Sequence, residues 1–318
     1  PLYHEGNNIR NTGHIDFTDS LTKELDLHLG YNNTLYHYQE TEGEVIGWPF
    51  SPTPATGLPV QAEPSYSADL DRIEQLATLD AHWKVTDETT GVLGYQYGHT
   101  AYTSHEYIIY PSGGFQGTPS TGNYYEPPLP PGVGNAGYHS NVRNSDSHFV
   151  FVGGDQSFTP ELSASLRVGG EYLDYYNFHT SRVSPYVDAS LTDQYLPGDS
   201  AQIGVKHIHN STDVVGSIGT TPVLDEESTA IYASDTHKLT EHLSLNVMGQ
   251  AQLSTFVGGG NGYDDKSDQF FVLQANFSYR FNPWWMAEAG YNYSKLNSDL
   301  PNRAYTRDFM YLGVRATY

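Results

Sequence analysis

The chain has 318 residues, no cysteine, and 37 acidic side chains against 15 Lys and Arg, which gives a formal net charge of −22. The lack of cysteine excludes a disulfide scaffold and thiol chemistry. The acidic balance argues against nucleic-acid binding, because neutralising phosphates needs a basic face and the sequence shows none. Mean hydropathy is −0.52, and no run approaches the ~18–20 apolar residues of a membrane-spanning helix.

Alternation of apolar and polar residues predicts an all-β chain. We expect thirteen strands, each with period-two patterning. In chain order they cover residues 8–17, 22–36, 70–85, 90–103, 146–157, 162–176, 183–191, 200–209, 228–236, 242–256, 268–281, 284–296 and 306–318. Most are longer than the usual 5–6 residues of globular sheets, and a tilted strand needs about 9–11 residues to cross a bilayer.

The predicted connections alternate between short and long. The short turns include 18–21, 86–89, 159–162, 239–242 and 281–284, and they resemble one another in sequence. The long segments cover about 37–69, 104–145, 210–227, 257–267 and 297–305, with a shorter one near 177–182. Strict alternation of tight turns and long loops is typical of outer-membrane β-barrels, in which the tight turns are periplasmic and the loops external.

The two faces of the predicted strands differ in polarity. In 242–256, Leu245 and Val247 face one way, and Asn246 and Gln250 face the other. The last strand repeats the pattern: Met310, Leu312, Val314, Ala316 and Tyr318 share an apolar face that ends on an aromatic residue. A soluble antiparallel strand can read the same way, but here most of the chain shares the pattern.

The last strand resembles the C-terminal signal of bacterial outer-membrane β-barrels. The stretches DRIEQLATLDAHWKV, VGGDQSFTPELSASLRVGGEY, SPYVDASLTDQYLPGDSAQIGVKH and FNPWWMAEAGYNYSKLNSDLPNRAYTRDFMYLGVRATY are similar to a porin-like barrel family of undetermined function. The resemblance covers nearly the whole chain, is strongest from about residue 145 onward, and implies a single transmembrane antiparallel β-barrel domain over 1–318 with a signal peptide. It also implies further strands before Pro1, because such barrels need an even strand number, so we expect about 16–18 in all.

The polar faces carry ionisable and amide side chains that we expect to line the barrel lumen. These residues are Glu24, Asp26, His28, Asp80, His82, Arg167, Glu171, Asp188, Lys206, Asn246, Gln250, Arg280, Glu288 and Arg315. For each one, the alternative is a structural charge pair across neighbouring strands. Aromatic residues near the short turns predict a membrane-interface girdle of Trp83, Phe281, Trp284, Trp285 and Tyr318.

No pattern indicates catalysis, a metal or a cofactor. Asp80 with His82, and His14 with Asp16, lie two apart on one face, but such pairs arise often by chance and lack a nucleophile. His207 and His209 are also two apart, without a further identifiable metal ligand. The acidic, glycine-rich segment 258–268 matches no EF-hand spacing, so a solvated loop is favoured over a Ca²⁺ site. The chain is therefore expected to be no enzyme and to bind no metal or cofactor.

The sequence leaves three functions open. The first is a porin-like barrel in the bacterial outer membrane that passes small polar solutes or ions with weak cation selectivity. The second is a plugged structural or surface-display barrel whose long, acidic, Tyr-rich loops bind an external partner. The third is a soluble carbohydrate binder with Tyr and Trp platforms. Expected partners of a barrel are outer-membrane lipids, the barrel-assembly machinery, and either a second copy or an extracellular partner through the loops; nucleic acid is not expected.

Overall fold

The computed structural model describes residues 8–39, 64–109, 137–216, 220–260 and 262–316, and most of them are β-strand. The strands are β1 (Asn8–Ser20), β2 (Leu25–Tyr38), β3 (Arg72–Lys84), β4 (Thr89–Tyr102), β5 (Tyr107–Ile109), β6 (Tyr138–His139), β7 (Ser145–Ser157), β8 (Leu162–Tyr175), β9 (Thr180–Leu196), β10 (Asp199–Asn210), β11 (Val223–Lys238), β12 (Leu243–Gly258), β13 (Ser267–Arg280), β14 (Trp285–Ser298) and β15 (Tyr305–Ala316). Two short helices, α1 (Tyr66–Leu70) and the 3₁₀ helix η2 (Ser140–Arg143), complete the fold. None of the helices in the described part has the length and apolar character needed to cross a membrane.

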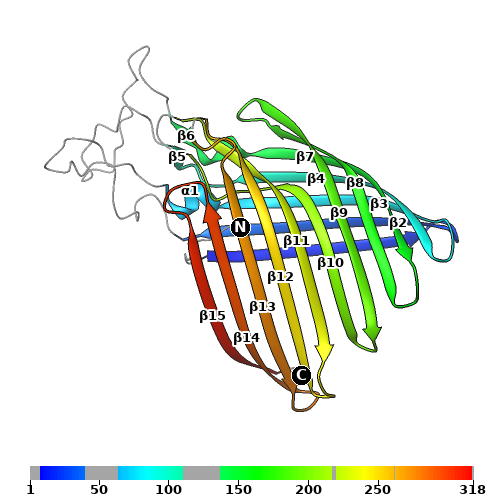
Figure 1. Cartoon of the computed structure of the whole chain (residues 1–318). Helices are drawn as coiled ribbons and strands as arrows, with labels where there is room; N and C mark the ends of the chain where they lie inside the picture. The colour runs from blue at the N-terminus through cyan, green and yellow to red at the C-terminus, as the bar shows by residue number, and fades with distance from the viewer. Residues whose placement is uncertain (1–7, 40–63, 110–136, 217–219, 261, 317–318) are drawn as a thin grey trace, which may run out of the picture.

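The main sheet has thirteen strands and follows chain order, with β4 paired to β7 because β5 and β6 form a separate two-stranded sheet (Figure 1). All pairings in the main sheet are antiparallel. The thirteen predicted strands are therefore confirmed as elements of one antiparallel sheet. A total of 16–18 strands stays a prediction.

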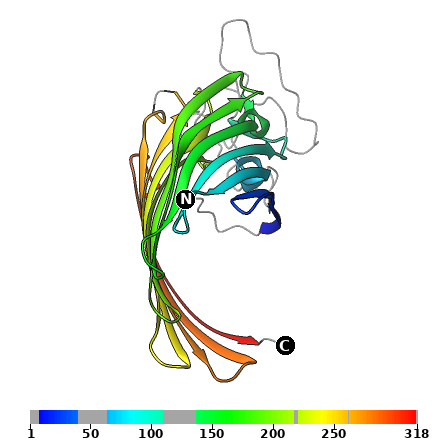
Figure 2. The ribbon, with the colours of Figure 1, turned by 90° about the vertical axis from the view of Figure 1, so that its right-hand side faces the viewer.

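The sheet bends into an open curved wall, which gives it a concave face and an outer face (Figure 2). Phe151 on β7 and Tyr186 on β9 bring their ring centroids to 5.4 Å although β8 lies between them. Gly169 of β8 makes this contact possible, because a Cβ there would lie 2.7 Å from the Phe151 Cβ. Side chains crowd together on the inside of a curve, and Phe151 and Tyr186 are 4% and 5% exposed against 56% for Val150 on the other side of the sheet, so Phe151 and Tyr186 mark the concave face.

The outer face is apolar and exposed over most of its area. Leu312 is 87% exposed, Met310 76% and Val314 69%. The same face of the other strands carries further large apolar side chains, including Leu29, Leu79, Leu93, Val150, Val152, Leu166, Val168, Leu191, Ile203, Ile231, Leu253, Phe271, Leu273 and Phe277. This alternation matches the predicted one, and its period of two explains why these segments form strands.

One end of the wall, the turn end, is built from short turns of one recurring design. In the β1–β2 turn, the Thr22 hydroxyl accepts hydrogen bonds from the backbone N–H groups of Glu24 and Leu25, at 3.1 and 3.0 Å. The turns that contain Thr86, Thr159, Thr240 and Asn282 repeat this arrangement. A side-chain oxygen that satisfies two turn amides is a local signal, so these turns are set by their own sequence.

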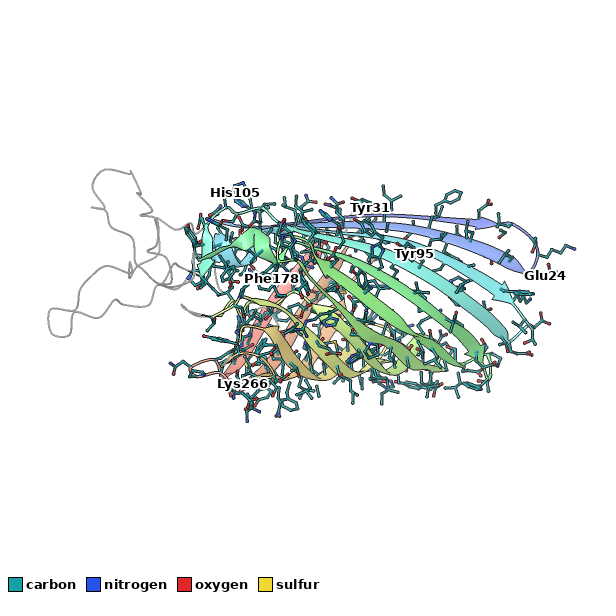
Figure 3. The ribbon with its side chains drawn as sticks, turned by 90° about the horizontal axis from the view of Figure 1, so that it is seen from above. Glu24, Tyr31, Tyr95, His105, Phe178 and Lys266 are labelled. Atoms are coloured by element: carbon teal, nitrogen blue, oxygen red, sulfur yellow. The ribbon has the colours of Figure 1, made fainter. Side chains whose placement is uncertain are left out.

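The opposite end, the loop end, contains structure that the sequence analysis treats as loop. Figure 3 shows His105, Phe178 and Lys266 at this end and Glu24 at the turn end. Segments 37–69 and 104–145 contribute α1, β5, β6 and η2. The predicted strand 70–85 is wrong at its start, because Leu70 closes α1, whose N-cap Ser65 accepts a hydrogen bond from the Ala68 N–H at 3.0 Å.

Several strand boundaries also differ from the prediction. β9 and β11 are longer than the predicted 183–191 and 228–236. Glu24 lies in the β1–β2 turn instead of on a strand, because its backbone bonds to Thr22. β9 accommodates Pro185 because its pairing with β10 stops at Val187, so the missing N–H interrupts no ladder on that side. Tyr318 lies outside the described residues.

Candidate functional site

The loops at the loop end fold together into a cap, which we define as segments 64–71, 103–109, 137–144, 211–216 and 299–304. One apolar cluster joins Ala68, Ile108, Ile109 and Val215, and a second joins Val214, Val223, Phe256 and Leu300. Full burial of side chains the size of isoleucine contributes about 1.5–3 kcal/mol each. The cap therefore has a hydrophobic core of its own.

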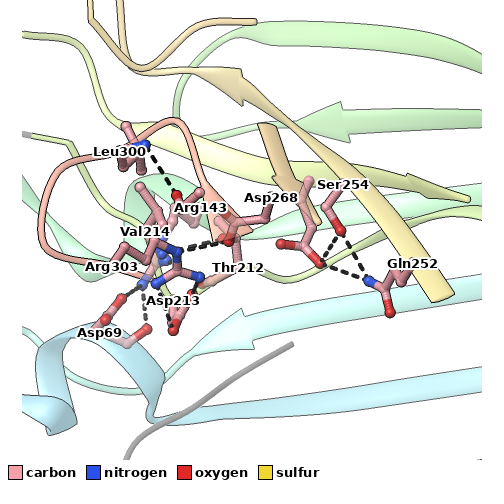
Figure 4. A network of polar contacts seen from close by, with 12 residues as sticks. Asp69, Arg143, Thr212, Asp213, Val214, Gln252, Ser254, Asp268, Leu300 and Arg303 are labelled. Atoms are coloured by element: carbon pink, nitrogen blue, oxygen red, sulfur yellow. Dashed lines mark hydrogen bonds and ion pairs between the residues drawn. The ribbon is translucent and has the colours of Figure 1, made fainter. Parts of the chain in front are cut away.

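Arg143 of η2 connects three cap segments (Figure 4). Its Nη2 lies 3.1 Å from the Asp69 carboxylate of α1 and also donates to the Asp69 backbone carbonyl. Its Nη1 donates to the Thr212 carbonyl at 3.1 Å. The guanidinium stacks on the Tyr102 ring, 4.2 Å from its centroid, and Arg143 is 1% exposed.

Arg303 makes the corresponding connection on the other side of the cap. It forms a bidentate pair with Asp213, and its Nε donates to Asp268 of β13 at 2.7 Å. Asp268 is fully buried and Asp213 is 7% exposed. Thr212 and Asp213 are adjacent, so the contacts run without a break from the β2–β3 connection to the β14–β15 connection, near the two edges of the sheet. The cap thus bridges the open side of the curved wall.

Asp69 is a buried carboxyl of the cap with a raised pKa. Burial raises the pKa of its carboxyl to about 7, with Arg143 acting in the opposite direction and Asp213 adding to the rise. Breaking a buried ion pair by removing one partner is costly because it leaves the other charge without a partner. The ion pairs therefore hold the cap segments in one arrangement.

A cavity of about 320 Å³ lies beneath the cap. Strands β2, β3, β4, β7, β8, β10 and β11 supply its wall, together with Arg143. Its ionisable residues other than tyrosine are Glu74, Arg143, Glu171, His209 and Asp225. The end of β10 leans over the concave face here, since the His209 N–H donates to Glu171 Oε2 of β8 at 3.3 Å. We call this space the cap cavity.

A second cavity of about 420 Å³ continues along the concave face of β1, β2 and β3 and shares Asn32 and Leu76 with the cap cavity. It brings together the predicted residues His28, Asp80 and His82, with the rings of His28 and His82 4.2 Å apart. His14 and Asp16, which contact each other, also line it. The Thr18 hydroxyl also lines this cavity and lies 3.1 Å from His28 Nδ1.

The other predicted lumen residues mostly form short-range pairs on the concave face. Arg167 bonds Asp155 at 2.9 Å, Lys206 lies 3.8 Å from Asp188, and Arg315 lies 3.1 Å from Glu288. Asp26 lies opposite His82 in the β2–β3 ladder. Asn246 donates to Thr236 at 2.9 Å and Gln250 donates to Gln252 at 3.1 Å. Arg280 ends β13 at the turn end. That this face lines a lumen stays a prediction.

The two histidines considered as metal ligands have different partners. His207 contacts Glu227 at 2.9 Å and Thr229 at 2.8 Å, whereas His209 is buried against Glu171 and Ser184. Across the residues that the structure describes, no group of three or more His, Cys, Asp or Glu side chains could hold a metal ion. In the acidic segment 258–268, Asp264 instead accepts a hydrogen bond from the Gly258 N–H at 3.0 Å.

Tyrosine–aspartate pairs border the apolar area of the outer face. Near the loop end, the Tyr97 hydroxyl donates to Asp146 at 2.8 Å and the Tyr291 hydroxyl donates to Asp308 at 2.5 Å. Toward the turn end, the Tyr195 hydroxyl donates to Asp235 at 2.9 Å. Around the turns, the predicted interface aromatics Trp83, Phe281, Trp284 and Trp285 are each more than half exposed.

Comparison with known families identifies the chain. Residues 135–318, more than half of the sequence, match the family described as "Putative beta-barrel porin 2". The chain belongs to this porin family. It is accordingly a porin-like β-barrel protein of the bacterial outer membrane, as the resemblance of its last strand implies.

The porin-family chain is also similar to solved structures of transporters and receptors. The FrpB iron transporter from Neisseria meningitidis (F5-1 variant) matches with a TM-score of 0.47 and 10% identity, over 93% of this chain and 46% of that one. The ferric yersiniabactin uptake receptor FyuA from Yersinia pestis matches with 0.43 and 9%, over 93% and 43%. The siderophore receptor PirA from Acinetobacter baumannii matches with 0.41 and 10%, over 98% and 49%. The porin-family chain thus spans less than half the length of these structures, and no curated protein matches it.

The sequence analysis of the porin-family chain missed the cap residues. Asp69, Arg143, Asp213 and Arg303 all lie in segments taken as loop. Ser65 before Tyr66–Leu70 is an N-cap signal that could have predicted α1. The apolar run Tyr107–Ile109 could have indicated β5. The ion pairs left no signal, because Arg303 and Asp213 are 90 residues apart in the chain.

Proposed function

We propose that the chain forms the wall of a passive diffusion pathway for small polar solutes and ions, with weak cation selectivity. The observation that carries the proposal is the contrast between the two faces. The concave face carries paired charges, amides and two adjacent cavities, while the outer face is apolar. Side chains with charges of both signs are tolerated beside water and are costly in lipid. A transport role fits this contrast better than an enzymatic one.

The cation preference follows from where the acidic surplus lies. The chain has 37 acidic side chains against 15 Lys and Arg, and the concave face is nearly balanced by its pairs. The turns and loops therefore carry much of the surplus, for example at Glu88, Glu161, Asp264, Asp265 and Asp299. Negative charge at the mouth of a low-dielectric channel enriches cations.

Planar-bilayer recordings of the full-length protein test this function. We expect a reversal potential under a KCl gradient that indicates weak K⁺ preference. The preference should decline as salt rises, because the Debye length falls from about 30 Å at 0.01 M to about 3 Å at 1 M. Anion preference at low salt would refute the selectivity.

A second candidate is the plugged, surface-display barrel. The folded cap favours it, since the cap has its own core and bridges the open side of the wall at the loop end. The long segment 104–145 is the first candidate for the plug. It contributes β5, β6 and η2 to the cap, and its residues 110–136 lie outside the described residues. Absence of conductance in a correctly inserted protein would favour this candidate.

We also infer that the apolar outer face contacts membrane lipids. The absence of native cysteine allows single-cysteine variants to be compared. L312C and V314C on the outer face should react slowly with a water-soluble maleimide in outer membranes, and N246C and Q250C on the concave face should react quickly. Faster labelling of the first pair would contradict this orientation.

A further inference from the structure

The cap cavity has the size and chemistry of a binding site for a small molecule. Its volume of about 320 Å³ lies at the lower end of the roughly 300–1,000 Å³ typical of ligand pockets. Besides the ionisable residues, its wall offers the hydroxyl groups of Thr34, Thr100, Ser145 and Ser147 and the Phe149 ring.

The charges around the cap cavity are unequally compensated. Glu74 is paired with the buried Arg72, whose Nε donates to it at 2.7 Å. The charge of Arg143 is matched by Asp69 at 3.1 Å. Glu171 has a histidine as its ion-pair partner, His209 at 3.3 Å. Among the described residues of the wall, Arg143 and His209 are the only basic side chains, against Glu74, Glu171 and Asp225.

Asp225 is the least compensated of these groups. It is 4% exposed, and its Oδ2 accepts a hydrogen bond from the neutral Tyr175 hydroxyl. Its Oδ1 is buried and has no hydrogen-bond partner. His209 and Arg182 attract this carboxylate without forming a direct ion pair with it. A buried carboxylate that lacks a direct ion pair costs several kcal/mol, so a cation bound beside Asp225 is favoured.

Arg143 does not create an equivalent demand for an anion. Its Nε also lacks a hydrogen-bond partner. However, its two terminal nitrogens are bonded to Asp69 and Thr212, and its flat face covers the Tyr102 ring. The positive charge of Arg143 is therefore already paired, whereas the positive charge of a ligand near Asp225 would lie beside a carboxylate that has no direct ion pair.

We propose that the cap cavity is a binding subsite for a small organic cation, whose ammonium or guanidinium group is held by Asp225 and Glu171. Both groups donate charge-assisted hydrogen bonds to carboxylates. The hydroxyl groups of the wall solvate the rest of the molecule. The route by which the solute reaches the cavity rests on the proposed diffusion function. Binding in the cavity does not depend on that function.

Isothermal titration calorimetry of the full-length protein in detergent tests the binding. The probes share a four-carbon skeleton: putrescine with two ammonium groups, 1,4-butanediol with none, and succinate with two carboxylates. We expect putrescine to bind and the other two not to bind. The variant D225N should weaken putrescine at least about tenfold, the effect of losing one strong charge-assisted contact, and E171Q should weaken it in the same direction.

The matched control is D174N. Asp174 precedes the cavity-lining Tyr175 on β8, so its side chain lies on the opposite face of the strand. It removes the same charge at the same end of the wall, and putrescine affinity should stay as in the wild type. Retained heat-modifiable migration on gels shows that each variant is folded, and E171Q provides the test if D225N fails to fold.

The proposal is overturned if the wild type does not bind putrescine, if D225N and E171Q both bind it as tightly as the wild type, or if butanediol or succinate binds equally well. An equal loss in D174N would also overturn it, since the effect would then reflect general surface charge. Binding without bilayer conductance would refute only the diffusion function. Conductance without putrescine binding would refute only this subsite.

Discussion

The two ends of the curved wall are stabilised in different ways. At the turn end, each Thr or Asn turn satisfies its own amides within four residues of sequence. Single backbone hydrogen bonds, such as the one from the Lys84 N–H to the Glu24 carbonyl at 2.7 Å, join turns to the next hairpin. At the loop end, Arg143 and Arg303 join segments from distant parts of the chain through buried ion pairs. Because the hydrogen bonds within each turn are local, the turn end repeats one design and should tolerate a change in a single turn. The cap, in contrast, depends on every one of its segments being in place.

Among substitutions that should destabilise one end of the wall and not the other, Arg303→Ala is expected to have the largest effect. The substitution removes the guanidinium that Asp213 and Asp268 share in a buried ion-pair network, which costs about 3–5 kcal/mol. Hydrogen exchange should show faster opening of segments 211–216 and 299–304, with the turn end unchanged. The exposed Lys266→Ala is the control and should alter neither end. Equal loss of protection at both ends in Arg303→Ala would show that the cap is not a separate unit.

A pH change should act on the cap alone. The pKa of Asp69 is about 7 in the fold against an ordinary value of 3.8, so the folded cap binds this proton more tightly than the open cap does. The contribution of Asp69 to cap stability is therefore greatest at low pH and declines as pH rises from about 4 to 7, by at most about 1.4 kcal/mol per pH unit.

Hydrogen exchange of α1 and η2 at pH 5 and pH 8, corrected for intrinsic exchange rates, measures this contribution. The wild type should lose protection at pH 8, and Asp69→Asn should remove most of the pH dependence. Protection in α1 that increases with pH would contradict the assignment to Asp69.

The smallest effect is expected at a single turn. Thr86→Ala removes the oxygen that accepts from the Glu88 and Thr89 N–H groups at 3.2 and 3.0 Å. The exposed amides can bond water instead, so we expect a loss of about 0.5–1.5 kcal/mol in urea unfolding. Thr86→Ser keeps the oxygen and should restore most of the stability. A loss above that range would mean that the turns are coupled.

The same contrast explains what the sequence could predict. Period-two alternation and turn residues act within a few positions, so the strands, their faces and the turn end followed from the sequence alone. The cap did not, because α1, β5, β6 and η2 are too short for a periodic signal. Their stability comes from pairs such as Asp69 with Arg143, 74 residues apart. The charged residues of the concave face were predicted individually, but their partners, such as Asp155 for Arg167, were not.

The sequential strand order has a consequence for how the protein assembles. Strands that are neighbours in the sheet also follow each other in the chain, apart from β4 and β7, whose connection contains β5 and β6. Hairpins can therefore form one after another with little loss of chain entropy. The cap is different, because Arg143 and Arg303 find their partners only when the β2–β3, β10–β11 and β14–β15 connections are all in position. We therefore expect cap closure to be the final step of folding, and protection of α1 and η2 from protease to report that the whole wall is complete.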